Sequence, residues 1–185
     1  MDLDEQFERG QRFFLKGKYK QSIRVFSDLL DEGYEPALTC MSRGVSHLKI
    51  SDLEAALRDF DRAIRIDGRD ATSFYFRGSA RMLDGDYQGA VSDFSRAIEA
   101  NPGHRAALLA RGISYVNLGR NAEGVRDIKK AMRHAEAAIQ GFSDVNGWRG
   151  QLEKALAAVE DEKRHEPAEL TDEDIRILKH WMKAA

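Results

Sequence analysis

The sequence predicts an all-α fold of stacked helical hairpins, because it repeats itself at a fixed spacing. Gly10, Gly44, Gly78 and Gly112 each lie 34 residues after the previous one. Each glycine is followed by a small residue after twelve positions, a large apolar residue four positions later and another apolar residue three positions later. These sets are Ser22, Ala56, Ala90 and Gly124; Phe26, Phe60, Phe94 and Ile128; and Leu29, Ala63, Ala97 and Ala131. Columns that share one period indicate four copies of one structural unit.

The composition fits a folded chain with a charged surface. Hydrophobic residues make up 42% of the 185 residues, and charged residues 32%. The 29 basic and 31 acidic residues leave a net charge of −2, so we expect neither nucleic acid nor a membrane as a partner. Cys40 is the single cysteine, which excludes an internal disulfide. The N-terminus lacks a secretory signal and no apolar run approaches the ~20 residues of a membrane span, which favours the cytoplasm.

The repeated glycines need a physical reason, because a glycine inside a helix costs roughly 0.5–1 kcal/mol relative to alanine. Two helices of a hairpin can approach closely only where side chains are absent. The glycine and the small residue twelve positions later allow that approach, and the large residue that follows fills the adjacent space. The predicted helices cover 3–16, 19–31, 37–50, 53–66, 71–84, 87–100, 105–118 and 121–140.

The third copy resembles the tetratricopeptide repeat (TPR) family most closely, with Gly78, Gly85, Tyr87, Ala90, Phe94, Ala97 and Pro102 at the family's positions. The second copy departs from the pattern at Ser51, Leu53 and Gly68, and the fourth at Asn121 and Ile128. The resemblance covers residues 3–138 as four repeats, 3–36, 37–70, 71–104 and 105–138. It implies a right-handed superhelical solenoid of helix-turn-helix units.

Beyond residue 138 the period ends, and two further helices are expected. Residues 139–165 are predicted to form a C-terminal capping helix, with Trp148, Leu152 and Leu156 on one apolar face. Residues 166–185 are predicted to be a short linker and a terminal amphipathic helix that begins after Thr171. Three roles stay open for this last helix: a second cap, an occupant of the groove, or a segment exchanged between copies in a homo-oligomer.

One charge pattern also repeats. Position 7 of every repeat is arginine, and position 23 of the last three is aspartate. The residues are Arg9, Arg43, Arg77 and Arg111, with Asp59, Asp93 and Asp127. We favour an ion pair between the two helices of each hairpin, which leaves only Arg9 without its aspartate. A row of arginines that follows an acidic ligand is the alternative.

No chemistry of an enzyme is visible in the sequence. No phosphate-binding glycine loop is present, and the five histidines never pair at helical spacing. The carboxylates recur with the repeat, which is typical of a structural role. We therefore expect no catalytic activity, no cofactor and no metal ion.

The resemblance implies that the first helix of each repeat lines a concave groove. The residues it places there are Phe7, Gln11, Leu38, Met41, Val45, Tyr75, Phe76, Ser79, Leu109 and Ile113. This surface is mostly apolar, which favours a hydrophobic or amphipathic partner segment. Some of these positions can instead belong to the core between repeats. The Lys, Asn and Arg pattern with which one TPR subclass grips a C-terminal carboxylate is absent.

The sequence thus predicts an adaptor or scaffold that binds a protein or peptide partner. Two alternatives remain: a self-assembling structural protein, in which the groove receives a helix of another copy, and a small secretion-type TPR chaperone.

Overall fold

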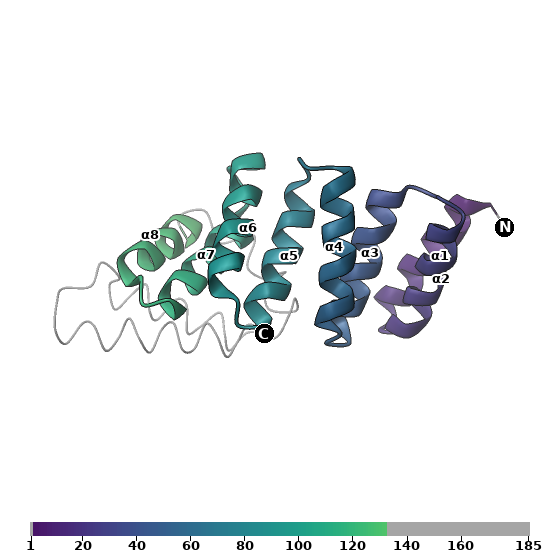
Figure 1. The fold of residues 1–185 in the computed structure, drawn as a ribbon, viewed down its shortest axis with the longest axis horizontal. Helices are drawn as coiled ribbons and strands as arrows, with labels where there is room; N and C mark the ends of the chain where they lie inside the picture. The colour runs from purple at the N-terminus through teal and green to yellow at the C-terminus, as the bar shows by residue number, and fades with distance from the viewer. Residues whose placement is uncertain (1, 133–185) are drawn as a thin grey trace.

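A computed structural model describes residues 2–132, which form a row of antiparallel helical hairpins (Figure 1). The helices are α1 (Leu3–Leu15), α2 (Tyr19–Asp31), α3 (Pro36–Lys49), α4 (Leu53–Ile66), α5 (Ala71–Leu83), α6 (Tyr87–Ala100), α7 (Arg105–Asn117) and α8 (Asn121–Met132). No strand occurs within residues 2–132. The predicted capping helix and terminal helix lie outside the described residues.

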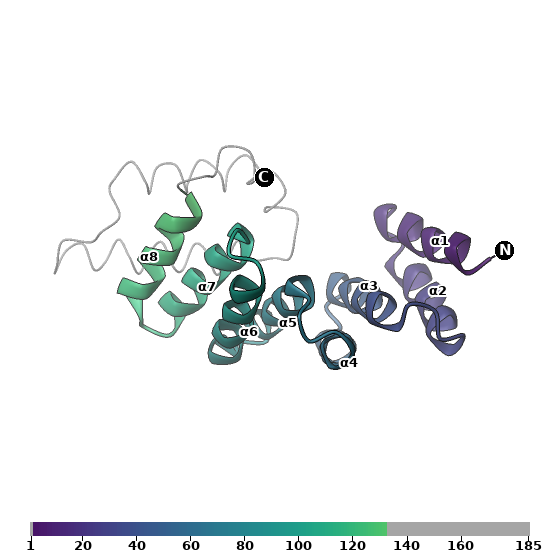
Figure 2. The ribbon, with the colours of Figure 1, turned by 90° about the horizontal axis from the view of Figure 1, so that it is seen from above.

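Each helix packs against the next one along the chain, and the odd-numbered helices also contact each other in turn. Seen from above, α1, α3 and α5 lie on one side of the array and α2, α4 and α6 on the other (Figure 2). The prediction of an all-α array of helical hairpins is therefore confirmed, whereas its handedness stays a prediction. None of the helices within residues 2–132 is long and apolar enough to cross a membrane.

The turn inside each hairpin uses the left-handed backbone region. Gly17, Gly85 and Gly119 have φ of 69°, 85° and 74°, values that glycine adopts without steric cost. Ser51, at the equivalent place in the second repeat, adopts φ of 61° although it carries a Cβ atom. The departure from the repeat pattern at this position therefore leaves the turn conformation unchanged.

The close approach of the two helices in a hairpin has the predicted cause. A Cβ atom added to Gly10 or Gly44 would lie 2.7 Å from Cε1 of Phe26 or Phe60. The same atom at Gly78 would lie 2.9 Å from Cε1 of Phe94. These phenylalanines are at most 1% exposed, so their rings have little room to move.

The favoured ion pair inside each hairpin is confirmed. In the third repeat the Arg77 Nε and Nη2 atoms donate to the two carboxylate oxygens of Asp93, at 2.9 and 2.6 Å. Arg43 binds Asp59 and Arg111 binds Asp127 with the same bidentate geometry. These bonds raise the pKa of each arginine further above its ordinary value.

The remaining arginine nitrogen makes a contact that the sequence analysis did not predict. The Nη1 atom of Arg77 donates to Asp61 of the preceding hairpin at 2.7 Å. Arg43 and Arg111 reach Ser27 and Ser95 in the same way, at 2.9 and 3.0 Å. We call Arg43, Arg77 and Arg111 the linking arginines, because each one joins three helices.

Replacing Gly44 with alanine tests the glycine–phenylalanine contact. The higher helix propensity of alanine stabilises the helix by roughly 0.5–1 kcal/mol. The added methyl group overlaps Phe60, however, and overpacking typically costs ~1–3 kcal/mol. We expect Gly44→Ala to lower the free energy of unfolding in urea by about 1 kcal/mol. Gly68→Ala is the control, because its Cβ atom would have no neighbour closer than 3.6 Å. Phe60→Leu should reduce the effect of Gly44→Ala; purely additive effects of the two changes would contradict the contact.

Removing Asp93 tests the linking arginines. Its side chain is 1% exposed and also accepts a bond from Arg81 at 2.8 Å. Asp93→Ala removes the buried carboxylate that two arginines share, and breaking a buried ion pair in this way costs about 3–5 kcal/mol. Asp61→Ala removes a partner of Arg77 that is 44% exposed, and should cost less than about 1 kcal/mol. If both variants lose the same free energy of unfolding in chemical denaturation, the buried Asp93 stabilises the fold no more than the exposed Asp61.

Candidate functional site

The strongest candidate site is an apolar cavity at the N-terminal half of the array, with a volume of about 380 Å³. Its lining comes from the odd-numbered helices α1, α3 and α5, with one residue from α2. The lining residues are Gln11, Phe14, Leu15, Phe26, Met41, Ser42, Val45 and Phe76. Residues three and four apart on a helix share one face, which is how α1 and α3 each present several of these side chains together.

Aromatic packing fixes the walls of the cavity. Phe76 stacks on Phe60 with ring centroids 6.0 Å apart and meets Tyr75 edge-on at 5.2 Å. Phe26 is buried beside Gly10, so its ring is held in place by the hairpin contact. Phe14 packs edge-on against Tyr19, with centroids 5.4 Å apart. The cavity is therefore bounded by side chains whose positions the fold determines.

The lining carries no charged side chain. Its polar groups are the exposed amide of Gln11 and the Ser42 side chain, and the Ser42 carbonyl accepts a bond from the Ser46 hydroxyl at 3.0 Å. Leu15 is 82% exposed and belongs to the lining. An uncharged cavity beside an exposed leucine suits an apolar side chain of a ligand.

The predicted groove residues divide into three groups: those that line the cavity, one that is exposed outside it, and those that are buried. Gln11, Met41, Val45 and Phe76 line the cavity together. Leu38 is 43% exposed on α3 but is not among the lining residues.

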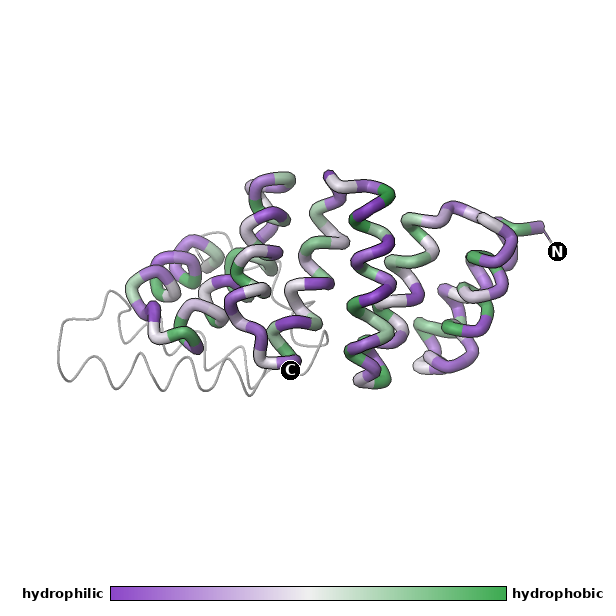
Figure 3. Tube along the Cα trace, in the orientation of Figure 1, coloured by the Kyte–Doolittle hydropathy of each residue, from purple (hydrophilic) through white to green (hydrophobic). Residues whose placement is uncertain are grey.

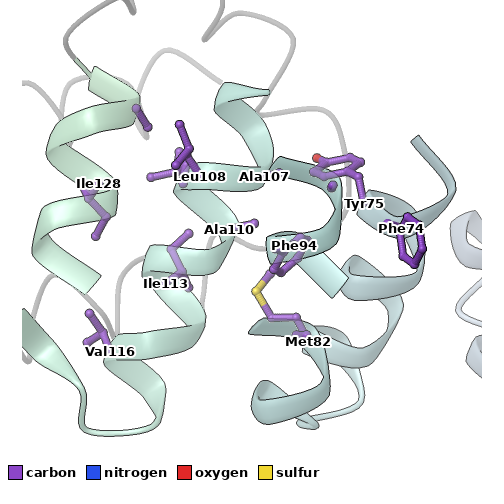
Figure 4. Packing of buried hydrophobic residues seen from close by; sticks show 14 of the residues in the cluster. Phe74, Tyr75, Met82, Phe94, Ala107, Leu108, Ala110, Ile113, Val116 and Ile128 are labelled. Carbon is purple, nitrogen blue, oxygen red and sulfur yellow. The ribbon is translucent and has the colours of Figure 1, made fainter. Parts of the chain in front are cut away.

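The other predicted groove residues are buried. Phe7 packs against Phe26 with centroids 5.3 Å apart. Tyr75, Leu109 and Ile113 belong to the core cluster between α5, α6, α7 and α8 (Figure 4). Ser79 is fully buried and donates to the Tyr75 carbonyl at 2.8 Å. These positions match the alternative that part of the first-helix surface belongs to the core between repeats; whether the ten residues form one ligand groove stays a prediction.

Leu15 and Phe26 were missed as lining residues, whereas Phe14 and Ser42 lie at positions of the repeat that the resemblance places in the groove. Phe26 was assigned only to the contact with Gly10, and its ring turns out to serve both the hairpin core and the cavity. Leu15 lies two residues before the turn glycine Gly17, at position 13 of its repeat, which the resemblance counts among the groove positions although Leu15 was not named in the predicted set. Its position in the repeat was therefore the signal available in the sequence.

His104 is the N-cap residue just before α7 and contacts Tyr75, one of the predicted groove residues. Its Nδ1 atom accepts a bond from the Ala107 amide at 3.2 Å, and the two rings lie 4.8 Å apart. Burial lowers the pKa of His104 below its ordinary value, and a backbone hydrogen bond and the Asp70 carboxylate offset part of this effect. The imidazole therefore acts in its neutral form, as a helix cap.

Within residues 2–132, no three His, Cys, Asp or Glu side chains lie close enough together to hold a metal ion. Burial raises the pKa of the Cys40 thiol, so the reactive thiolate is disfavoured. Cys40 thus serves as a small buried residue, as its position in the repeat predicts.

Comparison with known proteins agrees with this architecture. The family model for the tetratricopeptide repeat matches residues 7–71, 41–105 and 75–133. No curated protein sequence matches the chain. The crystal structure of MamA is 20% identical, with a TM-score of 0.71, and the match covers 94% of this chain and 92% of MamA.

Two similar structures belong to peptide-binding proteins. YrrB, a TPR protein with an unusual peptide-binding site, is 22% identical with a TM-score of 0.65, over 72% of this chain and 69% of YrrB. The second TPR domain of human RPAP3, in complex with the HSP70 peptide SGPTIEEVD, is 30% identical with a TM-score of 0.56. That match covers 59% of this chain and 91% of the domain.

The pKa of His104 predicts how stability depends on pH. A lowered pKa in the folded state means that the unfolded chain binds the proton more readily between the two pKa values. The stabilisation is complete above the ordinary value of about 6.5 and is lost as the pH falls through the lower folded value. We expect the melting temperature to fall as the pH is lowered below about 6.5. His104→Asn keeps a capping side chain that does not titrate, and should flatten this slope. An unchanged slope would exclude His104 as its source.

Proposed function

We propose that this chain, which belongs to the tetratricopeptide repeat family, is an adaptor or scaffold. It holds an apolar segment of a partner polypeptide in the cavity between α1, α3 and α5. The observation that carries the proposal is the convergence of Phe14, Met41, Val45 and Phe76 on one uncharged cavity. A volume of about 380 Å³ lies within the range of roughly 300–1,000 Å³ common to ligand pockets. Peptide binding in YrrB and in the RPAP3 domain supports this class of function.

The chemistry of the cavity favours particular partners. Phe7, Gln11, Ser42 and Phe76 stand where the carboxylate-binding TPR subclass has lysine, asparagine or arginine. A C-terminal carboxylate would therefore find no cation in the lining. A hydrophobic or amphipathic helix, whose side chains recur every three to four residues, suits the apolar lining better.

The proposal includes no catalytic role and no cofactor. Ser42 is the one possible nucleophile among the lining residues, and no histidine or carboxylate lines the cavity beside it to act as a base. We also propose the cytoplasm as the site of action. Self-assembly and a secretion-type chaperone role remain outcomes that the experiment below can reveal.

Leu15→Asp is the sharpest test of the cavity. Peptides are selected from a random phage-displayed library on the wild-type protein, and the affinity of a selected peptide is then measured for each variant. Burying a leucine side chain contributes roughly 1.5–3 kcal/mol, so the aspartate should weaken binding about tenfold or more. Leu15 is 82% exposed, so its replacement should leave folding nearly unchanged.

Ile66→Asp is the matched control, because Ile66 is an aliphatic residue at the end of α4 with 49% exposure. Its affinity for the selected peptide should equal that of the wild type. Peptides that bind Leu15→Asp as tightly as the wild type would place the site elsewhere. A mass that rises with protein concentration in light scattering would favour self-assembly instead.

A further inference from the structure

The even-numbered helices carry basic side chains on their outer face at two recurring places. Positions 22 and 26 of the four repeats hold six basic residues, one aspartate and one serine. All eight side chains are exposed. The basic residues are Arg24, Arg58, Arg62, Arg96, Arg126 and Lys130, which we call the outer basic stripe.

The two positions are four residues apart, so they share one face of each helix. The even-numbered helices follow one another along the array, so the stripe extends along it from α2 to α8 (Figure 1). Arg65 adds a third exposed arginine to that face of α4. Figure 3 shows α4 with hydrophilic and hydrophobic segments in alternation, as expected for a helix with one buried and one outer face.

The stripe is distinct from the cavity. The cavity is lined mainly from α1, α3 and α5, which lie on the other side of the array from α2, α4 and α6 (Figure 2). The whole chain has a net charge of −2, so this positive face is a local concentration and not a consequence of overall charge.

Acidic residues of the same helices neutralise only part of the stripe. Arg58 pairs with Glu54 one turn away, and Arg96 pairs with Glu99. Both pairs are highly exposed, and such pairs contribute little and exchange readily. Arg24, Arg62 and Arg65 form no ion pair with any residue within 2–132. Several guanidinium groups are thus available to an anionic ligand.

We propose that the outer basic stripe binds an acidic polypeptide segment, rich in aspartate and glutamate. Five of its six members are arginines, whose planar guanidinium groups bind carboxylates through two parallel hydrogen bonds. Nucleic acid fits less well, because single strands are bound largely by stacking on exposed aromatic rings. Within residues 2–132 the exposed large hydrophobic side chains are all leucine or isoleucine.

The test uses the full chain and a fluorescein-labelled poly-glutamate peptide of about 12 residues, which covers roughly 40 Å at ~3.3 Å per residue. Binding is measured by fluorescence anisotropy. We expect Arg62→Glu/Arg96→Glu to lower the affinity about tenfold or more, and added salt to weaken wild-type binding because exposed charges are screened. Urea denaturation of each variant verifies that the fold is retained.

Arg12→Glu/Lys16→Glu is the matched control, since it changes the net charge equally but lies on α1 and the turn after it. This variant should bind the peptide within about twofold of the wild type. Equal losses of affinity in the two double variants would show that poly-glutamate binds by unspecific charge attraction and not at the outer basic stripe. Tighter binding of a single-stranded DNA oligonucleotide of the same charge would overturn the choice of ligand. Leu15→Asp should leave poly-glutamate binding unchanged, which separates this surface from the cavity.

Discussion

The array depends on one interaction above all, the three-way contact of each linking arginine. Arg77 binds both oxygens of Asp93 within its own hairpin and Asp61 of the preceding hairpin. A solenoid is stabilised by contacts within repeats and between neighbours, and here one guanidinium group supplies both. Because its nitrogens are arranged in a rigid plane, the bonds fix the rotation and height of one hairpin relative to the next. The apolar contacts can then interdigitate in a single way.

The spacing inside each hairpin follows from the glycine and phenylalanine columns. Gly44 lets α3 approach α4 until the Phe60 ring fills the place of a side chain. The same ring stacks on Phe76 of the next hairpin, so this residue transmits the geometry of one repeat to the next. Phe76 in turn forms a wall of the cavity. The site is therefore a consequence of the packing pattern.

Sequence reasoning recovered the columns in which the residue type is kept and missed the contacts in which it changes from repeat to repeat. The helices and the Arg–Asp pairs recur every 34 residues, so each copy supports the reading of the others. The third arginine bond goes to Ser27, Asp61 and Ser95, and the change of residue type concealed that column. The cavity is lined by residues of three repeats that differ in type from one repeat to the next. Val45 and Ser79 occupy the same position of successive repeats but differ in burial, because their neighbours differ. The residue pattern of a single helix does not contain this information.

The two faces of the array are built by different rules, and this difference permits two binding functions in one small chain. On the odd-numbered helices, lining residues such as Phe76 serve both the packing between hairpins and the cavity, so substitutions of these residues disturb the fold. On the outer face of the even-numbered helices, Arg62 and Arg126 are exposed and carry no packing role, so their charge is free to serve recognition. The same separation appears at the N-terminal edge. Arg12 is exposed there, whereas Ser46, Ala80 and Ser114 at the equivalent position are fully buried between hairpins. Charged side chains thus occur where no hairpin packs. The outer basic stripe is therefore a property of the sequence that the fold itself does not require.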